Sequence, residues 1–342
     1  MKHYAGLDVS LEETFICVVD ESGKRVWRGA TKSDPQTISR VIRKRAPKLV
    51  ELGFEAGPLC RWFWHEFKEM GLPVVCLDAR HAKAALSMQV NKTDANDAYG
   101  LARIVRTGWY RAVEVKSIES HVVRSLLAVR SQLVGIRTRL SNQLRGILKT
   151  FGLVVGKVSG RSLESRVREL TAGNLMLKDV VESILNVWRT IYDQLAVIDK
   201  KLRQFSHSNE VCRRLMSVPG VGPVTAAAFM AAIDDPDRFK RSSSVGAYFG
   251  LTPKRYQSGE VDRSGKISKC GDSRVRSYLY EAAGVLLTRV KKWSKLKAWG
   301  VRLATRVGLR KAKVAVARKL AVILYRIWVD NSKFQWGDAP SL

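Results

Sequence analysis

The chain has 342 residues, of which 46% are apolar, and this apolar content excludes a mainly disordered protein. Lys and Arg number 60 against 31 Asp and Glu, so the formal net charge is +29. Such an excess of positive charge excludes an ordinary metabolic enzyme as the first interpretation and favours a polyanionic partner. A nucleic acid is the first candidate for that partner, and an acidic membrane surface is the second.

Neither a membrane helix nor a disulfide framework is expected. No apolar run approaches the roughly 20 residues that a membrane-spanning helix needs, and Met1 leads into a strand-like segment instead of a signal peptide. The five cysteines include no C-x-x-C pair, which argues against a zinc site. Cys17 and Cys76 lie in apolar runs and are predicted to be buried. We therefore expect a cytoplasmic protein with reduced thiols.

The N-terminal part predicts alternating strands and helices. Strands are predicted over residues 4–9, 14–20, 26–30, 49–55 and 73–77, and helices from Asp34 and over 58–70 and 94–106. Asp34 followed by Pro35 marks a helix start, because Asp is a favourable N-cap and Pro a favourable first residue. The order β-β-β-α-β-α-β-α is the pattern of the α/β ribonuclease-H-like fold.

The middle of the chain carries two helical repeats. Leu126, Leu133, Leu140 and Ile147 recur every seven residues, with Val129 and Ile136 between them. A second apolar series runs through Leu177, Val181, Ile184, Trp188, Ile191, Leu195, Ile198 and Leu202. A polar linker over 152–173 separates the two. We expect two long helices that form either an antiparallel arm or a dimerising coiled coil.

The positive charge is concentrated after this α/β region. Residues 1–105 hold 16 basic and 13 acidic residues, whereas residues 106–342 hold 44 and 18. A phosphate backbone would bind the second part, with an affinity that falls steeply as salt rises. Residues 285–342 hold 14 basic residues and predict basic amphipathic helices with either a solvated or a phosphate-binding face. Trp293, Trp299, Trp328 and Trp336 in this stretch either stack on bases or belong to the core.

Two glycine-containing segments follow the helical repeats. Val218-Pro219-Gly220-Val221-Gly222 predicts a tight turn between two helices, similar to a helix-hairpin-helix. Gly220 and Gly222 would let backbone N–H groups approach a phosphate, although such turns also join helices without DNA. The glycine-rich stretch 247–271 predicts a loop whose backbone approaches a ligand.

Four acidic residues lie on the predicted elements that converge in a ribonuclease-H-like sheet. Asp8 is in the first strand, Glu55 ends the fourth, and Asp94 and Asp97 begin a helix, three residues apart on one face. Each could be purely structural, for example Asp94 as a helix N-cap. Together they would crowd like charges that only a divalent metal neutralises. Hard oxygen ligands select Mg²⁺ or Mn²⁺, and two such ions suit phosphodiester chemistry.

Ser258 is the candidate nucleophile. It precedes Gly259 in the glycine-rich stretch, among the cationic and aromatic residues Lys254, Arg255, Tyr256, Arg263, Lys266 and Lys269. A serine hydroxyl attacks only when a base or a metal activates it, and nearby cations stabilise charge on a phosphate. The alternative is a turn serine beside phosphate-binding lysines. The cluster Ser242-Ser243-Ser244 is a weaker candidate.

The order of these motifs resembles a known family. Gly6-Leu7-Asp8-Val9-Ser10, Phe54-Glu55-Ala56-Gly57, Lys92-Thr93-Asp94-Ala95-Asn96-Asp97-Ala98, Val218-Pro219-Gly220-Val221-Gly222 and Gly250-Leu251-Thr252-Pro253 through Tyr256-Gln257-Ser258-Gly259 occur in the order found in DEDD transposases of the insertion-sequence-110 family. The resemblance covers nearly the whole chain. It implies a RuvC-like domain (1–115), a coiled-coil helical arm (116–206) and a mostly α C-terminal transposase domain (207–342).

The resemblance also implies the chemistry. It assigns the metal-binding tetrad to Asp8, Glu55, Asp94 and Asp97, the catalytic serine to Ser258, and the cofactor to Mg²⁺ or Mn²⁺. The implied partners are donor and target DNA, a noncoding bridge RNA, and further copies of the chain in a dimer or tetramer. Lys92 and the glycines and cations named above are the expected nucleic-acid contacts. A metal-only nuclease and a non-enzymatic nucleic-acid-binding protein are the alternatives, and the membrane surface is the weakest one.

Overall fold

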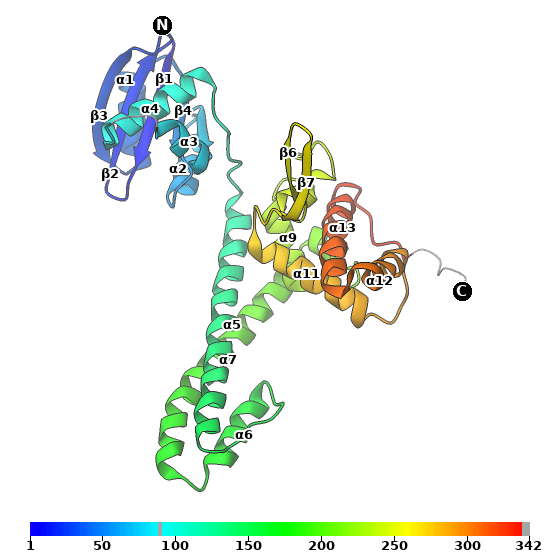
Figure 1. Cartoon of the computed structure of the whole chain (residues 1–342). Helices are drawn as coiled ribbons and strands as arrows, with labels where there is room; N and C mark the ends of the chain where they lie inside the picture. Colours follow the sequence, from blue (N-terminus) through cyan, green and yellow to red (C-terminus); the bar gives the residue numbers. More distant parts are fainter. Residues whose placement is uncertain (88–90, 337–342) are drawn as a thin grey trace. The chain divides into compact units, whose positions relative to one another are not determined.

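The computed structural model describes residues 1–87 and 91–336, and these form two compact units. The first unit is Met1–Lys116 and the second is Ser117–Leu342 (Figure 1). The boundary between the units lies one residue from the predicted end of the α/β domain. Both the predicted helical arm and the predicted C-terminal domain belong to the second unit, so the division near residue 206 stays a prediction.

The first unit is built on a five-stranded mixed sheet. The strands are β1 (His3–Val9), β2 (Glu13–Asp20), β3 (Arg25–Lys32), β4 (Leu49–Glu55) and β5 (Val74–Leu77). Their order across the sheet is β3-β2-β1-β4-β5. β1 pairs antiparallel with β2, and β2 with β3, whereas β4 runs parallel to both β1 and β5. The predicted mixed α/β fold is therefore confirmed.

Helices cover both faces of this sheet. They are α1 (Pro35–Arg45), α2 (Cys60–Glu69), α3 (Ala79–Leu86) and α4 (Asp94–Thr107). Successive residues of a strand point to opposite faces, and in β1 the side chains of Ala5 and Leu7 join the core formed with α1 and α2. Gly6 lies on the other face, against α4. α1 begins as predicted, since the Asp34 carboxylate accepts a hydrogen bond from the Thr37 backbone N–H.

The second unit begins with two long helices that lie side by side (Figure 1). They are α5 (Ile118–Thr150) and α7 (Leu175–Ser208), and α6 (Arg161–Thr171) lies between them in the chain. Arg130 Nε donates to Asp199, and Trp188 Nε1 donates to Ser141. Residues later in α5 therefore contact residues earlier in α7, so the two helices are antiparallel. The linker was predicted without a helix, but Leu163 and Val167 give α6 an apolar face that is buried in the arm.

The predicted apolar series matches the buried residues more closely on α7 than on α5. The series on α7 is buried except for the half-buried Ile184. On α5, Val129 was expected between the heptad residues but is 51% exposed. The buried residues there include Leu127 and Leu148, each next to a heptad residue, and Leu144, which lies between the heptad residues Leu140 and Ile147. Because α5 packs against several elements in turn, its buried face does not follow one seven-residue repeat.

The rest of the second unit is mostly helical. Its elements are α8 (Glu210–Leu215), α9 (Pro223–Ile233), α10 (Ser244–Tyr248), β6 (Pro253–Ser258), β7 (Val261–Ile267), α11 (Ser273–Thr288), α12 (Lys295–Val307) and α13 (Leu309–Val329). α9 is entirely buried from Ala226 to Ile233, and α11 and α13 contribute to the same core. β6 and β7 form a two-stranded hairpin that carries Ser258, where a loop was predicted.

All five cysteines are free, and Cys17 and Cys76 are buried as predicted. Within residues 1–87 and 91–336, no helix combines the length and the apolar character needed to cross a membrane.

Candidate functional site

The carboxyl ends of β1 and β4 bring Asp8 and Glu55 to one edge of the sheet. The two strands are parallel neighbours in which Gly6 pairs with Gly53 and Leu7 with Phe54. Asp8 and Glu55 are the next residues in the two strands. Since each lies two residues after a glycine, their side chains point to the face on which those glycines lie.

Glycines seat α4 directly on this face. A Cβ atom on Gly6 would come within 2.3 Å of the Ala102 backbone N and 2.4 Å of the Ala98 backbone O. A Cβ on Gly53 would lie 2.2 Å from a methyl of Val105. Only the absence of side chains therefore allows α4 to approach β1 and β4 so closely. Ala98 directly follows Asp97, so the first turn of α4 reaches the strand ends that carry Asp8 and Glu55.

Negative charge accumulates at this end of the sheet. The pKa of Asp8 is raised to about 6, chiefly by burial. The charges of Asp94, Asp97 and Glu55 add to that rise, and Lys92 opposes it. Burial also raises the pKa of Glu55, and the charge of Asp97 raises it further. The structure thus places the other three predicted acids within electrostatic reach of Asp8.

The acids are suitable ligands for a hard divalent cation, because carboxylate oxygens are the donors that Mg²⁺ and Mn²⁺ prefer. A cation there would also relieve the repulsion that raises the pKa of Asp8. In the described part of the chain, however, no three His, Cys, Asp or Glu side chains are grouped closely enough to hold one metal ion. The acids share an electrostatic environment, and their coordination geometry stays a prediction.

Asp8 and Glu55 open onto a cavity of about 700 Å³, which is lined by residues 8–12 and 54–60. Cys60, at the start of α2, belongs to this lining, and sequence analysis gave it no role. A hydrogen bond with the Cys76 thiol lowers the pKa of Cys60 below its usual value. Sequence analysis also missed Lys83 on α3, whose charge opposes the rise in the pKa of Glu55. The residue that could have predicted the start of α3 is Asp78, a favourable N-cap, which accepts hydrogen bonds from the Arg80 and His81 backbone N–H groups.

Ser258 lies at the tip of the β6–β7 hairpin, in the second unit. It pairs with Val261, so that Gly259 and Glu260 form the turn. Gly259 has φ +54°, a left-handed conformation that favours glycine. Every residue of β6 is exposed. No described residue makes a hydrogen bond to the Ser258 hydroxyl, which leaves it open to an incoming substrate.

The base of the hairpin is fixed to the helical part of the unit by two close backbone approaches. A Cβ on Gly250 would lie 2.2 Å from the Cys270 backbone O, and one on Gly271 would lie 2.0 Å from the Tyr248 backbone O. Arg276 of α11 donates from Nη1 to the backbone oxygens of Phe249 and Cys270. Gly250 and Gly271 therefore serve packing within the protein, whereas the sequence analysis attributed the glycines to ligand contact.

The predicted nucleic-acid contacts are placed unequally. Arg255 donates two hydrogen bonds to Asp262 across the hairpin, at 2.9 and 2.7 Å, so its guanidinium already has a partner. Tyr256 is 67% exposed on the same strand. Lys254 lies on β6 and Arg263 and Lys266 on β7, and all three are exposed.

Lys269, Gly220 and Gly222 lie outside the hairpin strands. Lys269 is in a left-handed conformation with φ +56° at the hairpin base. A Cβ on Gly220 would lie 2.4 Å from the Ala282 backbone O, so this glycine packs the turn against α11. Gly222, by contrast, precedes α9 with open space around it. Of the two turn glycines, Gly222 is thus the better placed to meet a phosphate.

The fold and these groups define a class of protein: a basic, two-unit nucleic-acid enzyme with an α/β unit that carries a group of carboxylates and a helical unit that bears a serine hairpin. Two transposase family descriptions match the chain. The IS110-type DEDD transposase covers residues 5–152, and "Transposase IS116/IS110/IS902 family" covers residues 212–298. The chain belongs to the IS110 family of transposases, enzymes that cut and rejoin DNA.

Individual relatives agree with this assignment. The transposase for insertion sequence element IS1111A of Coxiella burnetii is 30% identical over 97% of this chain and 91% of its own length. A probable family 20 transposase of Pseudomonas aeruginosa is 28% identical over 94% and 95% of the two chains. A pilin gene-inverting protein of Moraxella bovis is 24% identical over 50% and 53%. The similarity thus extends over both units.

Proposed function

We propose that the protein is an RNA-guided, metal-dependent DNA recombinase in which Ser258 is the nucleophile. The observation that carries the proposal is the gathering of negative charge from three separate chain segments around Asp8, which together with the larger effect of burial raises the pKa of this residue to about 6. Four carboxylates at the end of a sheet are costly unless a cation joins them. The resemblance to DEDD transposases and the relatives above support the same interpretation.

The proposed reaction exchanges one phosphodiester bond for another. The Ser258 oxygen attacks a DNA phosphorus, the bond from phosphorus to one deoxyribose oxygen breaks, and the serine proton passes to solvent while the leaving oxygen becomes a hydroxyl. A deoxyribose hydroxyl of another strand then attacks the phosphoserine and restores the serine. The bond energy is retained throughout, so no nucleoside triphosphate is required.

Different residues of the chain would bind the metal and the DNA. Asp8, Glu55, Asp94 and Asp97 would hold the Mg²⁺ or Mn²⁺, which when bound stabilises charge on the phosphate and activates the attacking or leaving oxygen. Lys92 offsets part of the negative charge of the acids. Lys254, Arg263 and Lys266 would hold the DNA backbone beside Ser258, because exposed cations on a short hairpin reach phosphates without burying themselves.

The acids and the serine belong to different units, so we propose a composite site that forms when DNA and RNA are bound, within one chain or between the subunits of a dimer or tetramer. A monomer would then be inactive, which protects the host DNA from unguided cutting. The bridge RNA would pair with donor and target DNA, and the protein would act in the cytoplasm. Support for the RNA and for the oligomer comes from the family resemblance and from the cationic second unit.

A metal-only nuclease is the second candidate. It is favoured by the absence, among the described residues, of any hydrogen-bond partner for the Ser258 hydroxyl. In that reaction water attacks and Ser258 only grips a phosphate. Cleavage without a covalent protein–DNA intermediate distinguishes it from the recombinase.

The test is recombination of a marked DNA pair by the purified full-length protein, with and without RNA transcribed from the flank of the element. We expect joined products only when RNA, Mg²⁺ and both DNAs are present, together with a discrete RNA that copurifies with the protein. Joined products formed equally well without RNA would contradict guided recombination. Cut but unjoined DNA without an adduct would favour the nuclease.

A further inference from the structure

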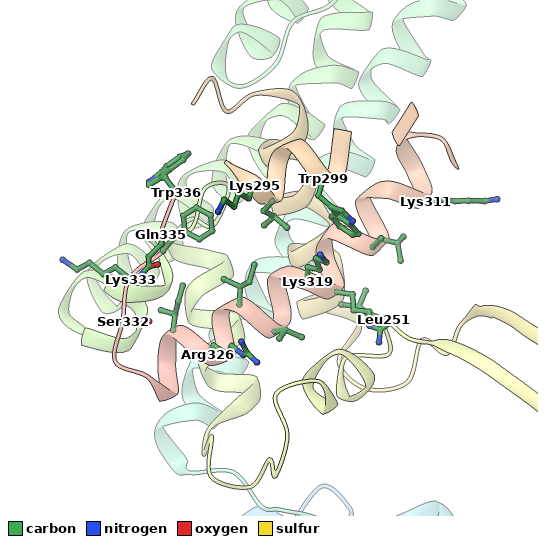
Figure 2. Close-up of a pocket in the computed structure, with 18 of the residues that line it drawn as sticks. Leu251, Lys295, Trp299, Lys311, Lys319, Arg326, Ser332, Lys333, Gln335 and Trp336 are labelled. Carbon is green, nitrogen blue, oxygen red and sulfur yellow. The ribbon is translucent and has the colours of Figure 1, made fainter. Parts of the chain in front are cut away.

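A long groove in the second unit has no role in the proposed chemistry. It runs along α13 and has a volume of about 1020 Å³. α12 forms one wall, and the segment Ser332–Trp336, which follows α13, forms another (Figure 2). The α13 residues that line it, from Lys311 to Ile327, recur every three or four positions and so share one helix face. Sixteen helical steps of about 1.5 Å give this face a length of about 24 Å.

The groove has an apolar floor and a cationic rim. Val314, Val322 and Ile323 of α13 lie among its apolar lining. Six lining residues are cationic, namely Lys295, Lys311, Arg318, Lys319, Arg326 and Lys333, and no lining residue is acidic. None of the six cations forms a salt bridge with a carboxylate of the described residues. The groove therefore suits an occupant that is both apolar and strongly anionic.

Aromatic side chains stand at both ends of the groove. Near Leu251, the Nζ of Lys319 lies 3.9 Å from the ring centroid of Trp299 (Figure 2). At the other end, Trp336 lies edge-to-face with Phe334, with ring centroids 5.6 Å apart. Pairs of a tryptophan and a cation are the groups on which unpaired bases stack while their phosphates are neutralised.

The wall formed by Ser332–Trp336 is held in place. The Phe334 backbone N–H donates to the Ser217 hydroxyl at 2.8 Å, and the Ser332 backbone N–H donates to the Ile327 carbonyl at 3.1 Å. Ser217 directly precedes the turn at 218–222. Hydrogen bonds to two separate parts of the unit keep the groove open without a ligand, which lowers the entropic cost of binding.

One end of the groove meets the serine hairpin. Pro253 at the start of β6 and Ile267 at the end of β7 both belong to the groove lining. From Pro253, Ser258 is five strand residues away, which at about 3.3 Å per residue is roughly 17 Å. A strand of DNA that follows the hairpin from Ser258 therefore reaches the groove within a few nucleotides.

We propose that the groove binds unpaired DNA next to the cleaved phosphodiester, with bases on the apolar floor and the tryptophans and with phosphates on the cationic rim. Duplex DNA offers mainly its charged backbone and would leave the apolar floor of the groove exposed to water. Strand exchange, by contrast, needs strands that are separated from their complements. The inference rests on the proposed function only in naming DNA as the strand, because binding is measured without cleavage.

The test measures fluorescence anisotropy of a labelled 12-nucleotide DNA strand, its duplex and the matching RNA strand, with the full-length protein in EDTA. We expect Trp299→Ala to weaken binding of the DNA strand about five- to 150-fold, the range for one base stacked on an aromatic side chain. Because Trp299 is half-buried, the second variant is Lys311→Ala/Arg326→Ala, at two exposed positions. It should lower the salt dependence of the affinity for the DNA strand by about 1.4 logarithmic units per decade of salt.

The matched control is Lys201→Ala/Arg203→Ala, which removes two exposed cations of α7 far along the chain from the groove residues. It should change the affinity for the DNA strand much less than the groove variants. Equal losses for strand and duplex, or no loss in either groove variant, would overturn the inference. So would a groove-dependent preference for the RNA strand, or displacement of DNA by an acidic amphipathic peptide that binds more tightly. If the native protein binds the DNA strand in the groove but forms no covalent adduct with DNA in a separate assay with Mg²⁺, that result would count against the proposed function alone.

Discussion

The acidic end of the sheet and the serine hairpin solve different structural problems. The acids of the first unit stand on the ends of β1 and β4 and on the first turn of α4, and glycines fix these elements at very short distances. The serine of the second unit stands at the exposed tip of a hairpin that is fixed only at its base. The first region stores repulsion between like charges, whereas the second lacks an activating group of its own. The first region would thus supply the activating metal that the second lacks, and the second would supply the nucleophile that the first lacks.

The largest effect is expected at the hairpin tip. Ser258→Ala should lower the yield of covalent protein–DNA adduct by at least about 10³-fold, because the attacking oxygen is removed. Ser264→Ala, on β7 of the same hairpin, is the control and should leave the yield unchanged. The measurement is denaturing gel electrophoresis with labelled DNA. An adduct of normal yield in the Ser258 variant would remove this serine from the mechanism.

The next effect is expected at the acids. Asp8→Asn should reduce metal-dependent strand transfer by about 10²-fold or more, since loss of one charged ligand weakens stabilisation of the transition state. Glu12→Gln is the matched control, because Glu12 lines the same cavity without belonging to the tetrad. Product formation is followed over time at fixed Mg²⁺. Full activity of the Asp8 variant would reject the metal site.

The close packing of α4 against β1 can be tested independently of the catalytic reaction. Gly6→Ala should destabilise the first unit by about 1–3 kcal/mol, because the new methyl overlaps the backbone of α4. Gly57→Ala should be nearly neutral, since the nearest atom to its new Cβ lies 3.9 Å away. Urea unfolding of both variants gives the comparison. Equal stability would show that α4 does not rest on β1 as closely as described.

Burial of Asp8 and the negative charges around it predict a pH dependence of stability in metal-free protein. The folded-state pKa of Asp8 is raised to about 6, above its usual value, so the folded state binds more protons than the unfolded state between about pH 4 and 6. Its contribution to stability is therefore lost as pH rises through this window. At pH 7.5 in EDTA, Asp8→Asn should be more stable than the native chain by about 1 kcal/mol, less than the full shift because solvent screens a half-buried group.

Scanning calorimetry at pH 4 and pH 7.5 measures this difference. The stabilisation of the Asp8 variant should disappear at pH 4, where the native carboxyl is protonated in the folded state. Added Mg²⁺ should raise the Tm of the native chain at pH 7.5 and have less effect on the variant. A variant that is less stable than the native chain at pH 7.5 would contradict the stored repulsion.

The smallest effect is expected at the hairpin ion pair. Arg255→Ala removes the exposed pair with Asp262 and should change adduct yield by no more than about two- to five-fold, because exposed ion pairs contribute little. Arg263 on the facing strand forms no salt bridge with a carboxylate in the part of the chain that the structure describes, so Arg263→Ala should act mainly through DNA affinity. Initial rates at low and saturating DNA separate the two. A loss at Arg255 as large as that at Ser258 would give this arginine a direct role in the chemistry.

The sequence predicted the first unit better than the second, for physical reasons. The strands are short apolar, β-branched runs bounded by turn residues, and β1 to β5 were therefore predicted with ends within about two residues of those observed. The acids could be placed because strand ends and a helix start are local features. Glycines inside β1 and β4 were a further signal, since glycine in a strand interior marks a close backbone approach. α3 was missed because it is short and only Asp78 separates it from β5.

In the second unit, the deciding interactions are between distant residues. β6 and β7 have no apolar face, and cross-strand partners such as Arg255 and Asp262 hold them together, so they were predicted as a loop. The groove depends on the return of Ser332–Trp336 to Ser217, a contact across more than 100 residues that no local pattern encodes. Local periodicity predicted the buried face of α7 well. It misplaced part of the buried face of α5, because α5 packs against several distant elements in turn.

The central claim is that carboxylates from three chain segments hold a divalent cation, and anomalous diffraction from Mn²⁺-soaked crystals of the complex with DNA and RNA tests it most directly. We predict an anomalous peak at about 2.0–2.2 Å from oxygens of Asp8, Glu55 and at least one of Asp94 and Asp97. A map without a peak among these four residues, in crystals that hold both nucleic acids, would contradict the account.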